Sequence, residues 1–247
     1  MFSIFSKKQF LIDSLEGFVD IHNHILPGID DGAKTVRDSL DLLKEFGTFG
    51  VNEFICTPHI MDNYYPNTPN TIGMAFNQVL VGLKGEKHIN DVRIHMAAEH
   101  MIDSNFENLL SKNEVMPLAQ NYILIEMSYL QESLNFKEAI NKIKEKGLFP
   151  IFAHPERYIY LTHQKGSYTT VKNLGILFQL NLLSLSNHYG EDIRKKAFKL
   201  LEDNQIDFVA SDVHNMKHLL KLKEIQISQK VLKLLKPIID KTIYNFT

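Results

Sequence analysis

Two histidines near the start of the chain are the clearest candidates for chemistry. A strand-like run, Phe-Val-Asp-Ile, leads into His22 and His24. Side chains two residues apart on a strand point to the same face, so both imidazoles can reach one metal ion. Asp212 and His214 repeat this spacing after another apolar run near the end of the chain. These two pairs predict that strand ends contribute metal ligands.

Four further apolar runs end in a histidine or a glutamate, namely His59, Glu99, Glu126 and His154. Any one of them has an ordinary explanation, because a polar residue often follows a buried strand or packs at a surface. Burying ionisable groups at all six strand ends without a cation would be costly, however. Imidazoles and carboxylates are ligands for Mn, Fe and Zn. The coincidence predicts a multi-metal centre, to which Asp31 adds negative charge.

Alternating strand and helix patterns predict the scaffold that positions these residues. Strand-like runs lie at 18–22, 51–56, 92–98, 121–126, 148–153, 176–181 and 206–210. Amphipathic helices are expected at 35–46, 136–146, 192–201 and 228–235, with Pro237 interrupting the last. Alternating β and α units form a parallel sheet with right-handed crossovers, and seven strands favour a closed or nearly closed barrel. The candidate ligands then lie at the carboxyl-terminal strand ends, where barrel active sites are built.

Composition indicates one globular α/β domain and excludes several classes of protein. The chain has 247 residues, a length that α/β barrels often use. Its 27 Lys and Arg against 29 Asp and Glu give a net charge of −2, which argues against a dedicated nucleic-acid or membrane binder. The single cysteine, Cys56, excludes an internal disulfide and any zinc module with two cysteine ligands. We expect Cys56 to pack in the core of its strand.

The first residues do not have the pattern of a secretory signal. Residues 1–16 carry their charge after the apolar residues and lack a long apolar stretch, so we expect a short extension on the surface of a single domain at 17–247. No run approaches the roughly 18 apolar residues of a membrane span. A cytoplasmic protein without an integral membrane segment is therefore expected.

Arg157 stands three residues after His154 in the motif His-Pro-Glu-Arg. A guanidinium beside a metal cluster suits bidentate binding of a phosphate. The alternative is an ion pair with Glu156 or another surface acid. The loop at 62–67, which follows His59 and contains two tyrosines, is either a plain solvent-exposed turn or a means of bringing an aromatic ring to the substrate.

These motifs together resemble the polymerase-and-histidinol-phosphatase (PHP) superfamily. The resemblance covers about residues 17–220 and rests on His-x-His, Thr-Pro-His, Ala-His-Pro-Glu-Arg and Ser-Asp-x-His in this order. Within the superfamily, segments 20–32 and 153–157 resemble the manganese-dependent bacterial protein-tyrosine phosphatases, which are encoded with capsule and exopolysaccharide genes. The resemblance implies a single-domain distorted (β/α)7 barrel with three metal ions at its mouth, expected to be Mn, with Fe or Zn as alternatives.

By position, the resemblance assigns ligands to each ion. The sets are His22, His24, Glu99 and Asp212 for the first ion, Glu99 (bridging), Glu126 and His154 for the second, and Asp31, His59 and His214 for the third. Asp30 is the rival of Asp31, because the sequence does not say which of two adjacent acids faces inward. Asp20 is a candidate to orient a ligand histidine from behind.

The resemblance also implies phosphate chemistry. Arg157, Asp31 and His59 are expected to take part in catalysis, in which a metal-activated hydroxide attacks phosphorus, and Arg157 is expected to bind the phosphate. Relatives often have a further arginine after Ser-Asp-x-His, whereas this chain offers Lys217 or His218. Substrate binding by Lys217 would use a point charge rather than a planar fork.

The expected substrate is phosphotyrosine on a protein, such as the tail of a bacterial tyrosine kinase of polysaccharide synthesis or export. The same site also suits a small-molecule phosphatase of the histidinol-phosphate type, or a nuclease, which the net charge disfavours. A third alternative is a metal-stabilised barrel that binds phosphotyrosine or a kinase tail without turnover. A homo-oligomer is compatible with the sequence.

Overall fold

Seven parallel strands form the centre of the molecule. The structure, a computed structural model, describes residues 8–86, 91–163 and 166–247. The strands are β2 (Val19–Asp20), β3 (Glu53–Cys56), β5 (Arg93–Met96), β7 (Tyr122–Glu126), β8 (Phe149–Ala153), β9 (Leu177–Asn181) and β10 (Phe208–Ala210). Two of them kink and resume, as β4 (His59–Ile60) after β3 and as β6 (Glu99–Met101) after β5. All seven predicted strands are confirmed.

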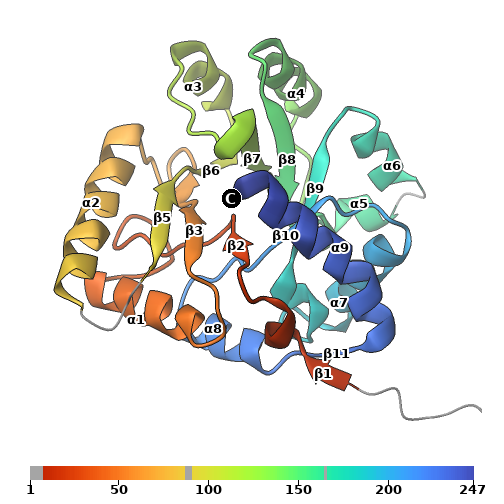
Figure 1. Cartoon of the computed structure of the whole chain (residues 1–247). Coiled ribbons are helices and arrows are strands. Elements are labelled where there is room, and N and C mark those ends of the chain that lie inside the picture. The colour runs from red at the N-terminus through yellow and green to blue at the C-terminus, as the bar shows by residue number, and fades with distance from the viewer. Residues whose placement is uncertain (1–7, 87–90, 164–165) are drawn as a thin grey trace, which may run out of the picture.

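The strands form a distorted, nearly closed (β/α)7 barrel (Figure 1). One sheet has the order β2-β3-β5 and the other β10-β9-β8-β7-β6-β4, and β4 and β6 continue the paths of β3 and β5. The first and last strands meet through a parallel bridge between Asn23 and Val213. Hydrogen bonds from Asp212 N to His22 O (2.8 Å) and from His24 N to Val213 O (3.0 Å) flank this bridge. The segments that close the barrel are therefore those that carry candidate ligands.

Helices cover the outside of the barrel (Figure 1), and α1 (Val36–Gly47), α4 (Phe136–Glu145) and α7 (Glu191–Glu202) lie where the sequence predicts them. In α1, Thr35 and Asp38 form a reciprocal capping box. None of the helices in the described ranges is both long and apolar enough to cross a membrane. The other elements are α2 (Pro69–Gly85), α3 (Phe106–Lys112), α5 (Tyr160–His163), α6 (Ser167–Lys172), α8 (Met216–Lys223) and the 3-10 turns η1 (Leu11–Ser14), η2 (Ala119–Asn121), η3 (Pro155–Arg157) and η4 (Leu182–Leu185).

The carboxyl-terminal helix corrects one prediction. Helix α9 (Gln229–Phe246) runs through Pro237 instead of being interrupted there. Pro237 and Lys233, whose carbonyl loses its helical partner, are both exposed, so water can satisfy that carbonyl. Leu235 and Ile239 on the opposite face are buried. Packing of this face against the barrel outweighs the local cost of the proline.

The amino-terminal segment is integrated with the rest of the domain. Residues 1–7 of the expected extension lie outside the described residues. Strand β1 (Lys8–Phe10) pairs antiparallel with β11 (Gln226–Ser228), and neither strand was predicted. Leu11 and Leu15 are buried in the core. Residues 8–15 therefore contribute to the packed structure.

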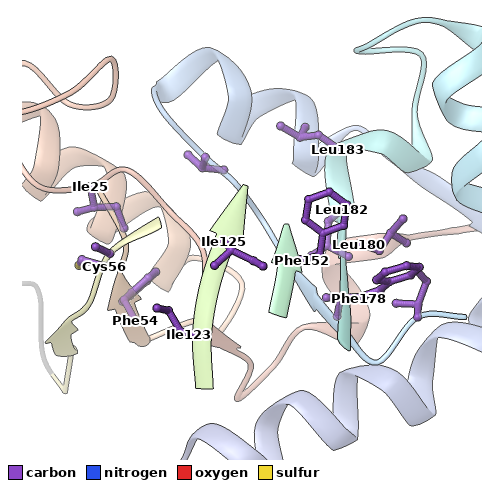
Figure 2. Close-up of a cluster of buried hydrophobic side chains, with 14 of the residues drawn as sticks. Ile25, Phe54, Cys56, Ile123, Ile125, Phe152, Phe178, Leu180, Leu182 and Leu183 are labelled. Carbon is purple, nitrogen blue, oxygen red and sulfur yellow. The ribbon is translucent and has the colours of Figure 1, made fainter. Parts of the chain in front are cut away.

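Alternate residues of the strands build two separate apolar layers. Ile123 and Ile125 of β7 pack in the layer between strands and helices (Figure 2). Cys56 is a buried free thiol in the same layer, as predicted. The residue between the two isoleucines, Leu124, belongs to a second cluster inside the barrel, together with Phe246 of α9. The strand period of two thus separates the helix-facing core from the interior in which the site lies.

Candidate metal centre

The barrel interior changes from apolar to charged toward the carboxyl-terminal strand ends. Three buried candidates continue the inward-facing alternation of apolar residues, with His59 four residues after Ile55, Glu99 two after Ala97 and Glu126 two after Leu124. The strand period of two keeps these side chains on the interior face. Local strand geometry is therefore enough to aim all three at one space.

His154 and Asp212 reach the same space through an unusual backbone. Both residues have positive φ, at 37° and 51°. This left-handed region is strained for residues other than glycine. In a regular strand, His154 would face outward, because the preceding Ala153 already belongs to the interior cluster. The left-handed backbone turns the His154 side chain inward. Strained backbone at strand ends is a common property of functional sites.

Four atoms form a compact group with the size of a metal site. They are His22 Nε2, His24 Nε2, Glu99 Oε2 and Asp212 Oδ1, the set predicted for the first ion. His22 Nε2 lies 3.4, 3.2 and 3.4 Å from the atoms of His24, Glu99 and Asp212. His24 Nε2 lies 3.6 Å from Glu99 and 3.4 Å from Asp212. Ligand atoms about 2.1 Å from a tetrahedral ion lie about 3.4 Å apart, so the donors fit such an ion.

Hydrogen bonds behind the two histidines determine which nitrogen faces this group. Gln179 Oε1 lies 2.8 Å from His22 Nδ1, and its amide nitrogen donates to Leu180 O. Asp30 Oδ2 lies 2.8 Å from His24 Nδ1. In the neutral rings, each Nδ1 therefore donates and each Nε2 presents a lone pair to the group. Sequence reasoning missed Gln179, because a glutamine within a strand carries no metal-binding pattern.

The adjacent acids Asp30 and Asp31 have different surroundings. Asp30 is buried behind His24, whereas the Asp31 side chain is half exposed. Asp31 Oδ1 lies 3.5 Å from His59 Nε2 and 3.4 Å from His214 Nε2. These separations again match pairs of donor atoms around one ion. The structure thus brings Asp31, and not Asp30, together with the rest of the predicted third set.

The predicted second set is divided between two neighbouring groups. Glu99 Oε1 lies 3.0 Å from His154 Nε2, whereas Glu126 Oε1 lies 2.8 Å from His59 Nδ1. Glu99 Oε2 also lies 3.0 Å from His59 Nδ1, so both oxygens of Glu99 face donors, as a bridging carboxylate requires. Among the described residues, Glu99 Oε2, Glu126 Oε1 and His59 Nδ1 make no well-aligned hydrogen bond. Buried polar atoms without partners are costly, and cations shared between them would satisfy them.

The charges in the cluster shift one another's pKa values. Burial would raise the pKa of Glu99, but the charges of His22 and His59 lower it well below its usual value. Burial would lower the pKa of His24, but the Asp30 carboxylate outweighs this and the pKa rises to about 10. Protons and metal ions therefore compete for the same lone pairs.

Asp20 interacts with the segments that carry two candidate ligands, His22 and Asp212. Its carboxylate accepts hydrogen bonds from Ser211 N (2.9 Å) and Ser211 Oγ (2.6 Å). Burial raises the pKa of Asp20 to about 6, although these bonds lower it. Asp20 therefore holds the segment that leads into Asp212 and interacts with the backbone of His22, and the expectation that it orients a ligand histidine stays a prediction.

Arg157 faces the cluster rather than the surface. Its Nη1 donates to Asp212 Oδ2 at 2.8 Å, and the side chain is only 17% exposed. Glu156 is buried elsewhere, where its Oε1 accepts from Ser184 Oγ (2.7 Å) and Asn181 N (3.1 Å). The alternative of an ion pair between Arg157 and Glu156 is therefore excluded.

A cavity of about 510 Å³ opens onto the cluster, with Glu99 and Arg157 in its lining. Tyr65 lies beside it and stacks on His59, with ring centroids 5.4 Å apart and planes 12° apart. Tyr64, also in the lining, is 77% exposed. The loop at 62–67 is thus more than a plain turn, because it places one ring on a candidate ligand and another at the cavity mouth.

Lys217 lies beside the cluster but not in the same cavity as Arg157. It lines a neighbouring cavity of about 490 Å³ that shares Asp31 and His214 with the first. His218 is held against the cluster, since its Nδ1 accepts from His214 N at 3.4 Å. Lys217, one of the two expected substitutes for a further arginine, therefore lines a different cavity from Arg157.

The comparisons with known proteins agree with this geometry. Residues 18–232 match the family model described as Capsular polysaccharide synthesis, CpsB/CapC. The tyrosine-protein phosphatase YwqE of Bacillus subtilis is 31% identical over 202 residues, which cover 81% of this chain and 78% of YwqE. The tyrosine-protein phosphatase CpsB of Streptococcus agalactiae is 30% identical over 204 residues, which cover 80% of this chain and 83% of CpsB.

Solved structures show the same fold. A chain from the crystal structures of YwqE from Bacillus subtilis and CpsB from Streptococcus pneumoniae, described as metal-dependent tyrosine phosphatases, aligns with a TM-score of 0.78 at 28% identity and covers 93% of this chain and 95% of that one. The histidinol phosphate phosphatase of Lactococcus lactis aligns with a TM-score of 0.54 at 12% identity, covering 92% and 94%. The expected PHP-type barrel is thereby confirmed.

Proposed function

The chain belongs to the capsular polysaccharide synthesis family CpsB/CapC, and on this premise we propose that it is a metal-dependent protein-tyrosine phosphatase. Membership of the family agrees with the resemblance that the motifs predict. The two relatives described above align with about four fifths of the chain and are named tyrosine-protein phosphatases.

The observation that carries the proposal is the meeting of buried acids and imidazoles beside one arginine. Nine side chains gather in overlapping groups, namely His22, His24, Asp31, His59, Glu99, Glu126, His154, Asp212 and His214. Arg157 donates to one of the acids from the cavity wall. Such a cluster combines sites for cations with a fixed positive charge for a phosphate.

We assign the nine side chains to three ions. His22, His24, Glu99 and Asp212 hold the first, Glu99, Glu126 and His154 the second, and Asp31, His59 and His214 the third. Manganese suits this set of nitrogen and carboxylate donors, and iron or zinc are the alternatives. When bound, the ions supply a nucleophile from water near neutral pH and Lewis-acid stabilisation of the phosphate.

Arg157 binds and stabilises the phosphate. A guanidinium has five N–H donors in one plane, so it can donate to phosphate oxygens while Nη1 keeps Asp212. Its charge opposes the negative charge of the equatorial oxygens in the transition state. Asp31 and His59 act by holding the third ion, and the half-exposed Asp31 lines the cavity that the substrate enters.

A phosphotyrosyl protein fits the mouth of this cavity. Phenolate, with a pKa of about 10, leaves more readily than an alkoxide. Tyr64 and Tyr65 supply aromatic surface beside the cluster for the substrate ring. We propose the tail of a tyrosine kinase of polysaccharide synthesis or export as the substrate and the cytoplasm as its place of action. The family description supports the link to polysaccharide synthesis.

The decisive experiment removes metal and then restores Mn(II), Fe(II) or Zn(II) before assay with phosphotyrosyl peptide, 4-nitrophenyl phosphate and histidinol phosphate. We expect metal-dependent release of phosphate, fastest from the phosphotyrosyl peptide. His24→Ala and Arg157→Ala should lose this activity, while Arg37→Ala, at an exposed arginine, should keep it.

Four results would contradict the proposal. Activity that is independent of metal, or unchanged in Arg157→Ala, would remove its basis. Faster hydrolysis of histidinol phosphate would favour a small-molecule phosphatase. Binding of phosphotyrosyl peptide without turnover would favour a non-catalytic binding module.

A further inference from the structure

The guanidinium of Arg157 lies against two tyrosine rings. Its Cζ is 4.5 Å from the ring centroid of Tyr129 and 4.4 Å from that of Tyr189. Tyr129 follows β7, Arg157 follows β8, and Tyr189 follows β9 and η4. Because β7, β8 and β9 are neighbours in this order, the two rings approach from the two sides of the strand that carries the arginine. A cation over an aromatic ring at this distance is attracted to it.

A network of hydrogen bonds holds the second ring in place. Asn181 Nδ2 donates to Tyr189 Oη (3.2 Å) and to Asp212 Oδ2 (2.7 Å). Arg157 donates to the same oxygen of Asp212. Arg157, Asp212, Asn181 and Tyr189 therefore form a closed ring of contacts. A bond from Asn181 N to Glu156 Oε1 ties this ring to the turn that carries Arg157.

We propose that Tyr129 and Tyr189 are positioning residues that hold Arg157 in the conformation that binds phosphate. The inference rests on the phosphate-binding role proposed for Arg157. An arginine side chain that is free to rotate loses rotamer entropy when it binds an anion. Two rings and one carboxylate remove that freedom before the substrate arrives, which raises the affinity for phosphate.

The test separates the rings from the hydroxyl groups. Tyr129→Leu and Tyr189→Leu remove a ring, whereas Tyr129→Phe and Tyr189→Phe retain it. In the metal-loaded protein, calorimetry with inorganic phosphate gives the affinity, and kinetics with 4-nitrophenyl phosphate give KM and kcat. Each leucine variant should weaken phosphate binding and raise KM by roughly 3- to 30-fold. Each phenylalanine variant should restore most of that loss, and all four should keep the wild-type metal content.

Two controls exclude a general structural effect. Tyr244→Leu, at a tyrosine that is 84% exposed on α9, should bind phosphate like the wild type. In an Arg157→Ala background, Tyr189→Leu should cause no further loss of phosphate affinity, because the ring acts through the arginine. Wild-type affinity in both leucine variants, an equal loss without Arg157, or a loss of metal together with affinity would each overturn the proposal.

The outcome is distinguishable from failure of the proposed function. A protein that binds phosphate through Arg157 but hydrolyses no aryl phosphate would contradict the phosphatase proposal, while the calorimetric series would still decide the role of the rings. An active phosphatase whose leucine variants keep full phosphate affinity would contradict only the positioning role.

Discussion

The two ends of the barrel interior use the same strands for opposite chemistry. Toward the amino-terminal strand ends, the interior is an apolar cluster that includes Leu124 and Phe208 and is closed by Phe246 of α9. Toward the carboxyl-terminal ends, the same strands lead into buried acids and histidines. The interior side chains change from apolar to charged within two residues, from Leu124 to Glu126 on β7 and from Ala210 to Asp212 after β10.

This difference separates stability from chemistry along each strand. Burial of apolar side chains stabilises the fold, whereas buried acids and imidazoles are unfavourable unless cations are shared between them. Substitutions in the apolar cluster should therefore change the free energy of unfolding more than the chemistry. Substitutions in the charged cluster should do the reverse.

The largest effect is expected at the centre of the charged cluster. Glu99→Gln removes the carboxylate whose oxygens face His22, His24, His59 and His154. The loss of kcat/KM should exceed the roughly 10- to 100-fold that loss of an outer partner of a ligand costs. Kinetics and elemental analysis of bound metal check this, with the exposed Glu138→Gln as control. Full metal content and full activity in Glu99→Gln would contradict a central role of the Glu99 carboxylate in metal binding.

The next largest effect is a loss of stability expected from a substitution in the apolar end of the barrel interior. Phe208→Ala deletes a fully buried ring that contacts Tyr122 and Phe246. It should lower the free energy of unfolding by about 3–5 kcal/mol in denaturant titrations, with kcat unchanged well below the transition. Phe149→Ala, at a ring that is half exposed, should cost much less. A kcat that fell with stability would show that the two ends are not separable.

A smaller effect, on metal affinity, is expected at Gln179, which holds the imidazole of the candidate ligand His22 from behind. Gln179→Leu removes the acceptor of His22 Nδ1, and so frees the imidazole to rotate or to change tautomer. Metal affinity should fall roughly 10- to 100-fold, measured by competition with a chelator. Gln131→Leu, at an exposed position, is the matched control. Equal affinity in both variants would mean that packing alone orients His22.

The smallest effect is a pH dependence of stability that should be steeper without metal. Asp30 raises the pKa of His24 from its usual 6.5 to about 10 against burial. The stability from protonated His24 is then fully present below pH 6.5 and is lost as the pH rises toward 10. Melting temperatures of chelated protein should fall over this range more steeply than those of metal-loaded protein. Parallel curves would contradict the competition between protons and metal.

Sequence reasoning predicted most of the charged end, because its residues follow strands of clear period and carry metal-binding types. It predicted neither Gln179 nor the rings of Tyr129 and Tyr189, since a glutamine in a strand and a tyrosine in a loop have many ordinary explanations. It did not predict the contact of Glu126 with His59. That contact depends on side-chain directions at neighbouring strand ends, which spacing along one strand does not specify.

The sequence by itself determined the seven strands, the flanking helices α1, α4 and α7 and the candidate ligands, because strand period, capping residues and ligand chemistry are local properties. Only the tertiary structure decided which atoms meet. It placed the carboxylate of Asp31, rather than that of Asp30, beside the Nε2 atoms of His59 and His214. It bonded Asp20 to Ser211 and continued α9 through Pro237. Each of these outcomes depends on contacts between segments far apart in the chain, where packing and charge outweigh local preference.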